Sequence, residues 1–122
     1  MGDPELLNML AAEAERRTPT IIVGVEDLAA SGEKDSALLE ELRVEAHGLK
    51  GAALVVGQKR LADLAKKVER FLADCVESGR IKPGPAAIVV AAASAFSEGA
   101  QAAAEGVAEP SAVGESLDAL PG

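Results

Sequence analysis

The chain contains a single histidine, His47, and the residues that follow it suggest chemistry that a lone imidazole can perform. Lys50 lies one helical turn later, and Gly51 comes directly after it. A histidine in an ordinary environment is largely neutral near pH 7, and a neutral imidazole is a nucleophile. Attack on a phosphoryl group would make a phosphohistidine, whose charged oxygens Lys50 could stabilise. The spacing therefore favours a phosphoacceptor site on His47.

A helix from about Asp35 to Val56 must position these side chains. Its apolar residues recur at steps of three and four and cluster opposite His47 on a helical wheel; they are Leu38, Leu42, Ala46, Leu49, Ala53 and Val56. Four residues fall within roughly 60° of His47 on that wheel: Arg43, Lys50, Gly51 and Leu54. We therefore expect His47 to point away from the core.

Two glycines, Gly48 and Gly51, lie inside this otherwise strong helix. Each costs about 1 kcal/mol relative to alanine. A helix accepts such a cost more readily where something must approach its backbone closely. Because Gly51 lies beside His47 and away from the apolar stripe, access for a partner is a better explanation than packing against a neighbouring helix.

Three further amphipathic segments are predicted. The first covers about Leu7–Leu28, the third about Gln58–Glu77, and the fourth about Ala86–Glu105, with Ile88 among its inward residues. Pro19 interrupts the first stripe without changing its phase, so we expect a kinked or split N-terminal helix. Short connections between the segments predict an all-α fold, an antiparallel up-down four-helix bundle.

The expected bundle occupies residues 1–106 as one domain. Residues 107–122 mix proline, glycine, serine and acids without a sustained period, and they are expected to form a flexible C-terminal tail. Aromatic residues make up only 2% of the chain, so the core must consist of aliphatic side chains and alanine. That composition suits closely packed helices rather than strands.

Charge and composition exclude several classes of function. A net charge of −8 argues against nucleic acid and gives no attraction to an anionic membrane. The single Cys75 fits a reducing compartment. The N-terminus lacks the features of a signal peptide, and the longest nearly apolar stretch, Ala86–Phe96, is too short to cross a bilayer. A cytoplasmic monomer is the expectation.

The residues around the histidine read Ala-His-Gly-Leu-Lys-Gly-Ala-Ala from Ala46 to Ala53. Gly57 follows, and then a run with Leu61, Leu64, Ala65 and Glu69. This pattern resembles the histidine-containing phosphotransfer (HPt) domain, whose His-x-Leu-Lys-Gly core is intact here. The strong match covers about Leu42–Leu72, and Gly48 departs from it, since a larger polar residue is common there.

The resemblance implies a phosphorelay intermediate in two-component signal transduction. His47 would accept a phosphoryl group from an aspartate of a receiver domain, in a hybrid histidine kinase, and pass it to a response regulator. Lys50 would assist the phosphoryl group, and Gly51 would leave room for the partner. Such a protein is not an autonomous enzyme and needs no cofactor, because Mg²⁺ would belong to the receiver.

On the wheel, Val44 and Leu54 fall near His47 and could form an apolar docking surface with Arg43 beside it. Partial burial at a helix seam is the alternative for the two apolar side chains. Two other functions remain open at this stage. The chain could be the phosphoacceptor domain of a chemotaxis-type histidine kinase, or a non-catalytic helical adaptor that binds its partners without phosphorylation.

Overall fold

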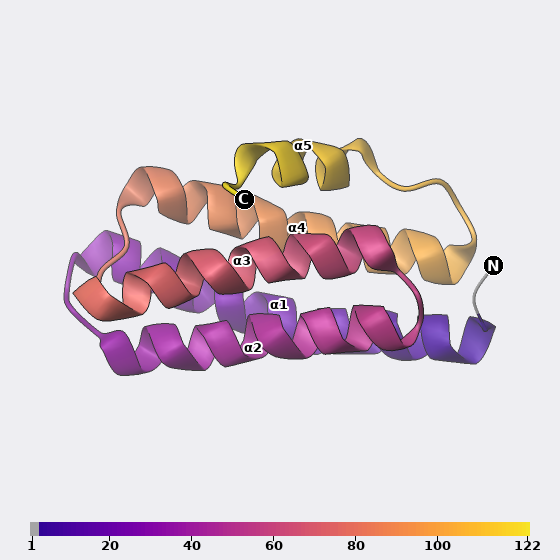
Figure 1. The fold of residues 1–122 in the computed structure, drawn as a ribbon, viewed down its shortest axis with the longest axis horizontal. Helices are drawn as coiled ribbons and strands as arrows, with labels where there is room; N and C mark the ends of the chain where they lie inside the picture. The colour runs from indigo at the N-terminus through magenta and orange to yellow at the C-terminus, as the bar shows by residue number, and fades with distance from the viewer. Residues whose placement is uncertain (1–2) are drawn as a thin grey trace.

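A computed structural model describes residues 3–122 and contains five helices in that range (Figure 1). Their bounds are α1 Pro4–Ser31, α2 Ser36–Val55, α3 Lys59–Ser78, α4 Pro83–Glu105 and α5 Ser111–Ala119. No strand occurs within these residues. The predicted all-α class is therefore confirmed.

The ends of the helices follow from the local sequence. The side chain of Asp3 accepts a hydrogen bond from the backbone N–H of Glu5, and Pro4 occupies the first turn of α1, where its missing N–H costs nothing. The side chain of Asp35 caps α2 in the same way by accepting from Leu38. At the other end of α1, Gly32 adopts a left-handed conformation with φ 67°.

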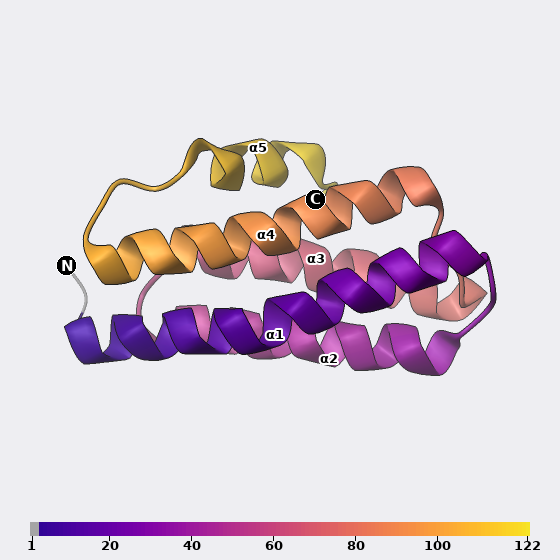
Figure 2. The same ribbon diagram turned by 180° about the vertical axis from the view of Figure 1, so that it is seen from behind.

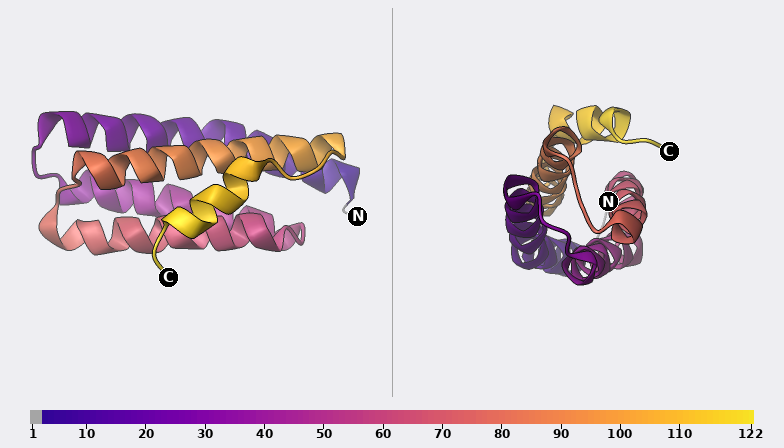
Figure 3. Two further views of the ribbon diagram at one scale, coloured as in Figure 1. Left: turned by 90° about the horizontal axis from the view of Figure 1, so that it is seen from above. Right: turned by 90° about the vertical axis from the view of Figure 1, so that its left-hand side faces the viewer.

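The four long helices pack side by side, and successive helices run in opposite directions (Figure 1). In the end-on view of Figure 3 they occupy the corners of a square, in which α2 lies between α1 and α3. Helix α4 closes the square by packing against both α1 and α3. This arrangement leaves one face of α2 open to solvent.

Helix α1 continues through Pro19 as one element, and it lies in front of the bundle in Figure 2. The hydroxyl of the preceding Thr18 is buried and donates to the carbonyl oxygen of Ala14 at 2.8 Å. Thr18 therefore lies inside α1, which is not divided at Pro19. The kink that we expect at Pro19 stays a prediction.

The core is aliphatic except for Phe96. Its largest fully buried side chains come from all five helices; they are Phe96, Leu10, Ile21, Leu39, Leu42, Leu64, Leu72, Val25, Val89 and Val113. The expectation for Ile88 is wrong, because this side chain is 38% exposed and its neighbour Val89 is buried instead. Apolar residues are nearly continuous along α4, so their spacing alone does not define the inward face.

Residues 107–122 do not form the flexible tail that their composition suggests. They contain α5, which lies across α3 and α4 (Figure 3). Val113 is fully buried, and Leu120 is 4% exposed. The Nζ of Lys67 donates to the carbonyl oxygens of Leu117 and Leu120 at 2.6 and 3.3 Å. Val113, Leu117 and Leu120 recur at steps of four and three, so the segment has a short helical period whose apolar side packs on the bundle.

Among the helices of residues 3–122, α4 alone has the length and apolar composition that could span a membrane. Half of its most apolar window is buried inside the bundle. Since the core helix of a globular protein passes the same test, these properties do not by themselves indicate a membrane span.

Candidate functional site

The turn between α2 and α3 sets the register of the site. Gly57 adopts a left-handed conformation with φ 73°, and Gln58 donates to the carbonyl oxygen of Ala53 at 2.9 Å. The two helices therefore fold back on each other within three residues. His47 and Glu69 lie equally far in sequence on either side of Gln58. In an antiparallel pair this symmetry brings the two residues to the same level.

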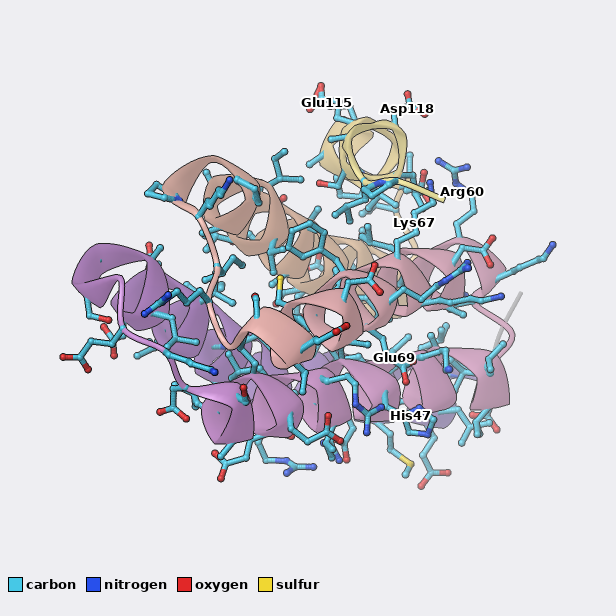
Figure 4. All side chains as sticks on the ribbon, turned by 60° about the vertical axis from the view of Figure 1, so that its left-hand side comes forward. His47, Arg60, Lys67, Glu69, Glu115 and Asp118 are labelled. Carbon is cyan, nitrogen blue, oxygen red and sulfur yellow. The ribbon has the colours of Figure 1, made fainter. Side chains whose placement is uncertain are left out.

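His47 projects from the open face of α2, with its side chain 61% exposed. Its Nδ1 lies 2.9 Å from Oε2 of Glu69 on the neighbouring helix (Figure 4). An ionised carboxylate only accepts hydrogen bonds, so Nδ1 carries the proton in this pair. The neutral imidazole then keeps its lone pair on Nε2. The contact with Glu69 thus directs the nucleophilic nitrogen away from the α2–α3 seam.

Glu69 is the least exposed charged group at the site, with 14% of its side chain accessible. Lys50 Nζ lies 2.8 Å from its Oε1, and Arg43 Nη1 lies 3.2 Å from its Oε2. Arg43 also pairs with Glu40 at 2.6 Å. Glu69 is thereby surrounded by two cations and the imidazole, and its position is fixed from three sides.

These contacts determine the charge of Glu69. Burial acts to raise the pKa of its carboxyl, but the Lys50 cation and the His47 N–H outweigh that effect, and the pKa of Glu69 lies below its ordinary value. The group is therefore ionised at neutral pH. The N–H at Nδ1 of His47 needs a hydrogen-bond acceptor, and the ionised carboxylate of Glu69 provides it.

The two glycines of α2 play different structural roles. A Cβ placed on Gly51 would meet no atom within 4 Å, so the surface beside His47 is open there and no neighbouring helix packs on it. A Cβ on Gly48 would lie 2.6 Å from the guanidinium carbon of Arg17. Arg17 reaches from α1 across Gly48 to Glu45, at 2.7 Å. Gly48 thus gives room to an ion pair between α1 and α2.

The two apolar residues near His47 are exposed. Val44 is 50% exposed and Leu54 is 59% exposed, and Val55 beside Leu54 reaches 75%. Burial at a helix seam therefore does not account for Val44 and Leu54. Together with the open surface above Gly51, they leave an apolar area along α2 on both sides of His47. Arg43 differs from both, because its guanidinium is held by Glu40 and Glu69.

His47, Lys50 and Gly51, which were predicted to share one face of α2, lie together there. Glu69 was not among the predicted site residues, although it lies in the run that carries the resemblance. The signal that could have found it is the equal distance of His47 and Glu69 from the turn at Gly57 and Gln58. Arg17 was also missed, since a contact across helices leaves no periodic trace.

The fold is a helical bundle with an exposed histidine, oriented by a carboxylate and flanked by a lysine. A helical bundle that presents such a histidine fits the class of histidine phosphotransfer domains. The sequence model of the Hpt domain matches residues 5–120, and the chain belongs to this family. Hpt domains carry phosphoryl groups on histidine in two-component signalling and interact with receiver domains. No curated protein matches the chain significantly.

Proposed function

We propose that this chain is a phosphorelay intermediate: His47 accepts a phosphoryl group from the aspartate of one receiver domain and passes it to a second response regulator. The observation that carries the proposal is the 2.9 Å contact between Nδ1 of His47 and Glu69. In the neutral imidazole this contact leaves the lone pair on Nε2, and an in-line attack on phosphorus needs such a nitrogen.

The transfer step balances without a further reactant. The lone pair of Nε2 forms the new P–N bond, while the bond between phosphorus and the aspartyl oxygen breaks. The aspartate leaves as a carboxylate and takes the bonding electrons. The proton on Nδ1 stays in place, so the phosphorylated ring carries positive charge. Glu69 stabilises that charge, and the reverse sequence of bonds returns the group to the next receiver.

Lys50 is the cation best placed to interact with the transferring oxygens. It follows His47 by one turn, and its Nζ lies 2.8 Å from Oε1 of Glu69. A short movement from that carboxylate would bring it to a phosphoryl group on Nε2, where it would offset the charge that develops during transfer. Gly51 adds the space that a receiver needs to reach His47.

Docking is assigned to the exposed surface of α2 around His47. Val44 and Leu54 supply apolar area that a partner could cover. Arg43 lies at the edge of this area and holds Glu69 in position. We also propose that α1 is kinked at Pro19. Because α1 packs beside this face of α2, the shape of α1 affects the docking surface.

The remaining properties follow from this role. The chain acts as a carrier that its partners phosphorylate and dephosphorylate, so it is not an autonomous enzyme. It holds no cofactor of its own, and the Mg²⁺ of the reaction belongs to the receiver. We propose that it works as a cytoplasmic monomer whose partners are the receiver domains of a hybrid histidine kinase and of a response regulator.

The proposal is tested by mixing the protein with radiolabelled phospho-receivers from several hybrid kinases. Label should move to the wild type and not to His47→Gln. A chemotaxis-type kinase with ATP serves as the competing donor. If that kinase alone donates label, the chain is a kinase phosphoacceptor domain and not a relay. If neither donates while the partners still bind both proteins, the chain is an adaptor.

A further inference from the structure

The first half of α3 is positively charged in a protein whose net charge is −8. Five of the chain's 12 lysines and arginines lie between residues 59 and 70, where the acids are Asp63 and Glu69. The five are Lys59, Arg60, Lys66, Lys67 and Arg70. Since Glu69 is already paired with Lys50 and Arg43, the local excess of positive charge is larger than the composition indicates.

Two of the five cations hold α5 in place. Arg60 pairs with Glu109 at 3.0 Å, and Lys67 caps the C-terminal end of α5. Figure 4 shows both on the side of α3 that faces α5, away from His47. These two residues therefore have a structural role.

The other three cations, which we name the α3 basic stripe, are Lys59, Lys66 and Arg70. All three are exposed, and none forms an ion pair within residues 3–122. On a helical wheel they fall within about 40° of one another. Lys66 and Arg70 line a pocket with Leu117 and Gly122, but the hydrogen bonds to that segment come from Lys67. The concentration of the three cations on one face therefore requires another explanation.

The stripe begins beside the site and runs along α3 toward the turn at Gly57. On the helical wheel Lys66 lies about 60° from Glu69 and Arg70 about 100° from it, so the stripe borders the side of α3 that carries Glu69. Glu69 in turn contacts His47. The apolar residues Val44 and Leu54 belong to α2. His47 therefore lies between an apolar surface and a positively charged one.

We propose that the α3 basic stripe is a docking surface for an acidic protein face, that of the partner which exchanges phosphoryl groups with His47. This inference rests on the proposed function. A partner that carries an aspartyl phosphate binds Mg²⁺ through oxygen ligands, largely carboxylates. The face around its phosphorylated aspartate is therefore acidic. A chain of net charge −8 would repel such a face unless positive charge lay next to the histidine. The stripe supplies that charge, and it acts on association and orientation rather than on the transfer step.

The test compares two double variants with the same change in net charge. Lys66→Glu with Arg70→Glu reverses the stripe, while Arg80→Glu with Lys82→Glu reverses two exposed cations beyond the far end of α3. The second-order rate of transfer from a radiolabelled phospho-receiver is measured at several NaCl concentrations. The rate at saturating receiver is measured separately.

The stripe variant should lose about tenfold in the second-order rate at low salt, and added salt should reduce the difference. Its rate at saturating receiver should equal that of the wild type, and the Arg80/Lys82 variant should lose much less. The neutral double variant Lys66→Gln with Arg70→Gln should have a second-order rate between those of the wild type and the charge-reversed stripe variant. This graded effect separates a loss of charge from misfolding. Equal rates and equal salt dependence for the two charge reversals would overturn the inference, as would a slower rate at saturation.

The same assay separates this inference from the proposed function. If the wild type takes no label from any receiver, the relay function fails and the docking surface fails with it. If the wild type is labelled and the stripe variant behaves like its control, only the docking surface is refuted.

Discussion

Nδ1 of His47 and Oε2 of Glu69 lie 2.9 Å apart, although the two residues belong to different helices. The contact depends on the tight turn at Gly57, which places the histidine and the carboxylate level with each other. It also depends on Lys50, which lowers the pKa of the carboxyl, and on Arg43, which helps to hold the carboxylate in position. One pair thus links the register of the bundle to the reactivity of the imidazole.

Glu69→Gln is expected to slow phosphoryl transfer about tenfold or more, because the amide can also donate to Nδ1 and no longer enforces one tautomer. The transfer rate is measured together with the ¹⁵N chemical shifts of the imidazole. The wild type should show a proton on Nδ1 and the variant a mixture. A slow variant that keeps the wild-type tautomer would assign Glu69 a purely structural role.

Lys50→Ala should reduce the rate of transfer about a hundredfold while weakening receiver binding much less, because the cation is needed only where charge develops on the oxygens. Stopped-flow transfer and equilibrium binding provide the two values. Lys82→Ala, which removes an exposed lysine far from His47, is the control. An unchanged rate in Lys50→Ala would remove this residue from the mechanism.

Alanine at the two glycines of α2 should have unequal effects on stability. Gly51→Ala places a methyl group in open space and should raise the free energy of unfolding by about 1 kcal/mol. Gly48→Ala must displace the Arg17 guanidinium and disturb its pair with Glu45, so its gain should be smaller. Urea denaturation measures both, and equal gains would contradict the role given to Arg17.

The larger replacement Gly51→Leu tests access rather than stability. Its side chain would project from the open surface beside His47 and should block receiver binding while leaving the helix content unchanged. Circular dichroism and binding titrations are the measurements. Normal receiver affinity would show that the glycine does not serve access.

Helix α5 should contribute to stability, because Leu120 and Val113 are buried against α3 and α4. Leu120→Ala is expected to lower the free energy of unfolding by about 2 kcal/mol or more. Asp118→Ala, at an exposed position of the same helix, should change it by less than about 0.5 kcal/mol. Equal and small effects would mean that residues 107–122 are not held on the bundle in solution.

Acid should weaken the fold partly through Glu69. The pKa of this carboxyl is lower in the fold than its ordinary value of 4.5, so its stabilising contribution is present above that value and is lost as the pH falls through the lowered pKa. Urea denaturation between neutral pH and pH 3 should therefore show a steeper loss for the wild type than for Glu69→Gln. Parallel curves would contradict the ion-pair assignment.

Much of this architecture could be predicted from the sequence, and the exceptions have physical causes. The α2 stripe and the spacing of His47, Lys50 and Gly51 are local, so a helical wheel places them correctly. Glu69 comes from another helix and was found only once the turn fixed the register. Helix α5 was missed because its apolar period, Val113, Leu117 and Leu120, covers only two turns and lies among proline and glycine residues.

The most direct test of the central claim is the chemistry of the labelled residue. After incubation with a radiolabelled phospho-receiver, label on the wild type should survive alkali and be lost in acid, as expected for a phosphohistidine, and His47→Gln should carry none. Nuclear magnetic resonance of the same sample should place the phosphorus on Nε2. Label that survives acid, or that appears equally on His47→Gln, would contradict the account.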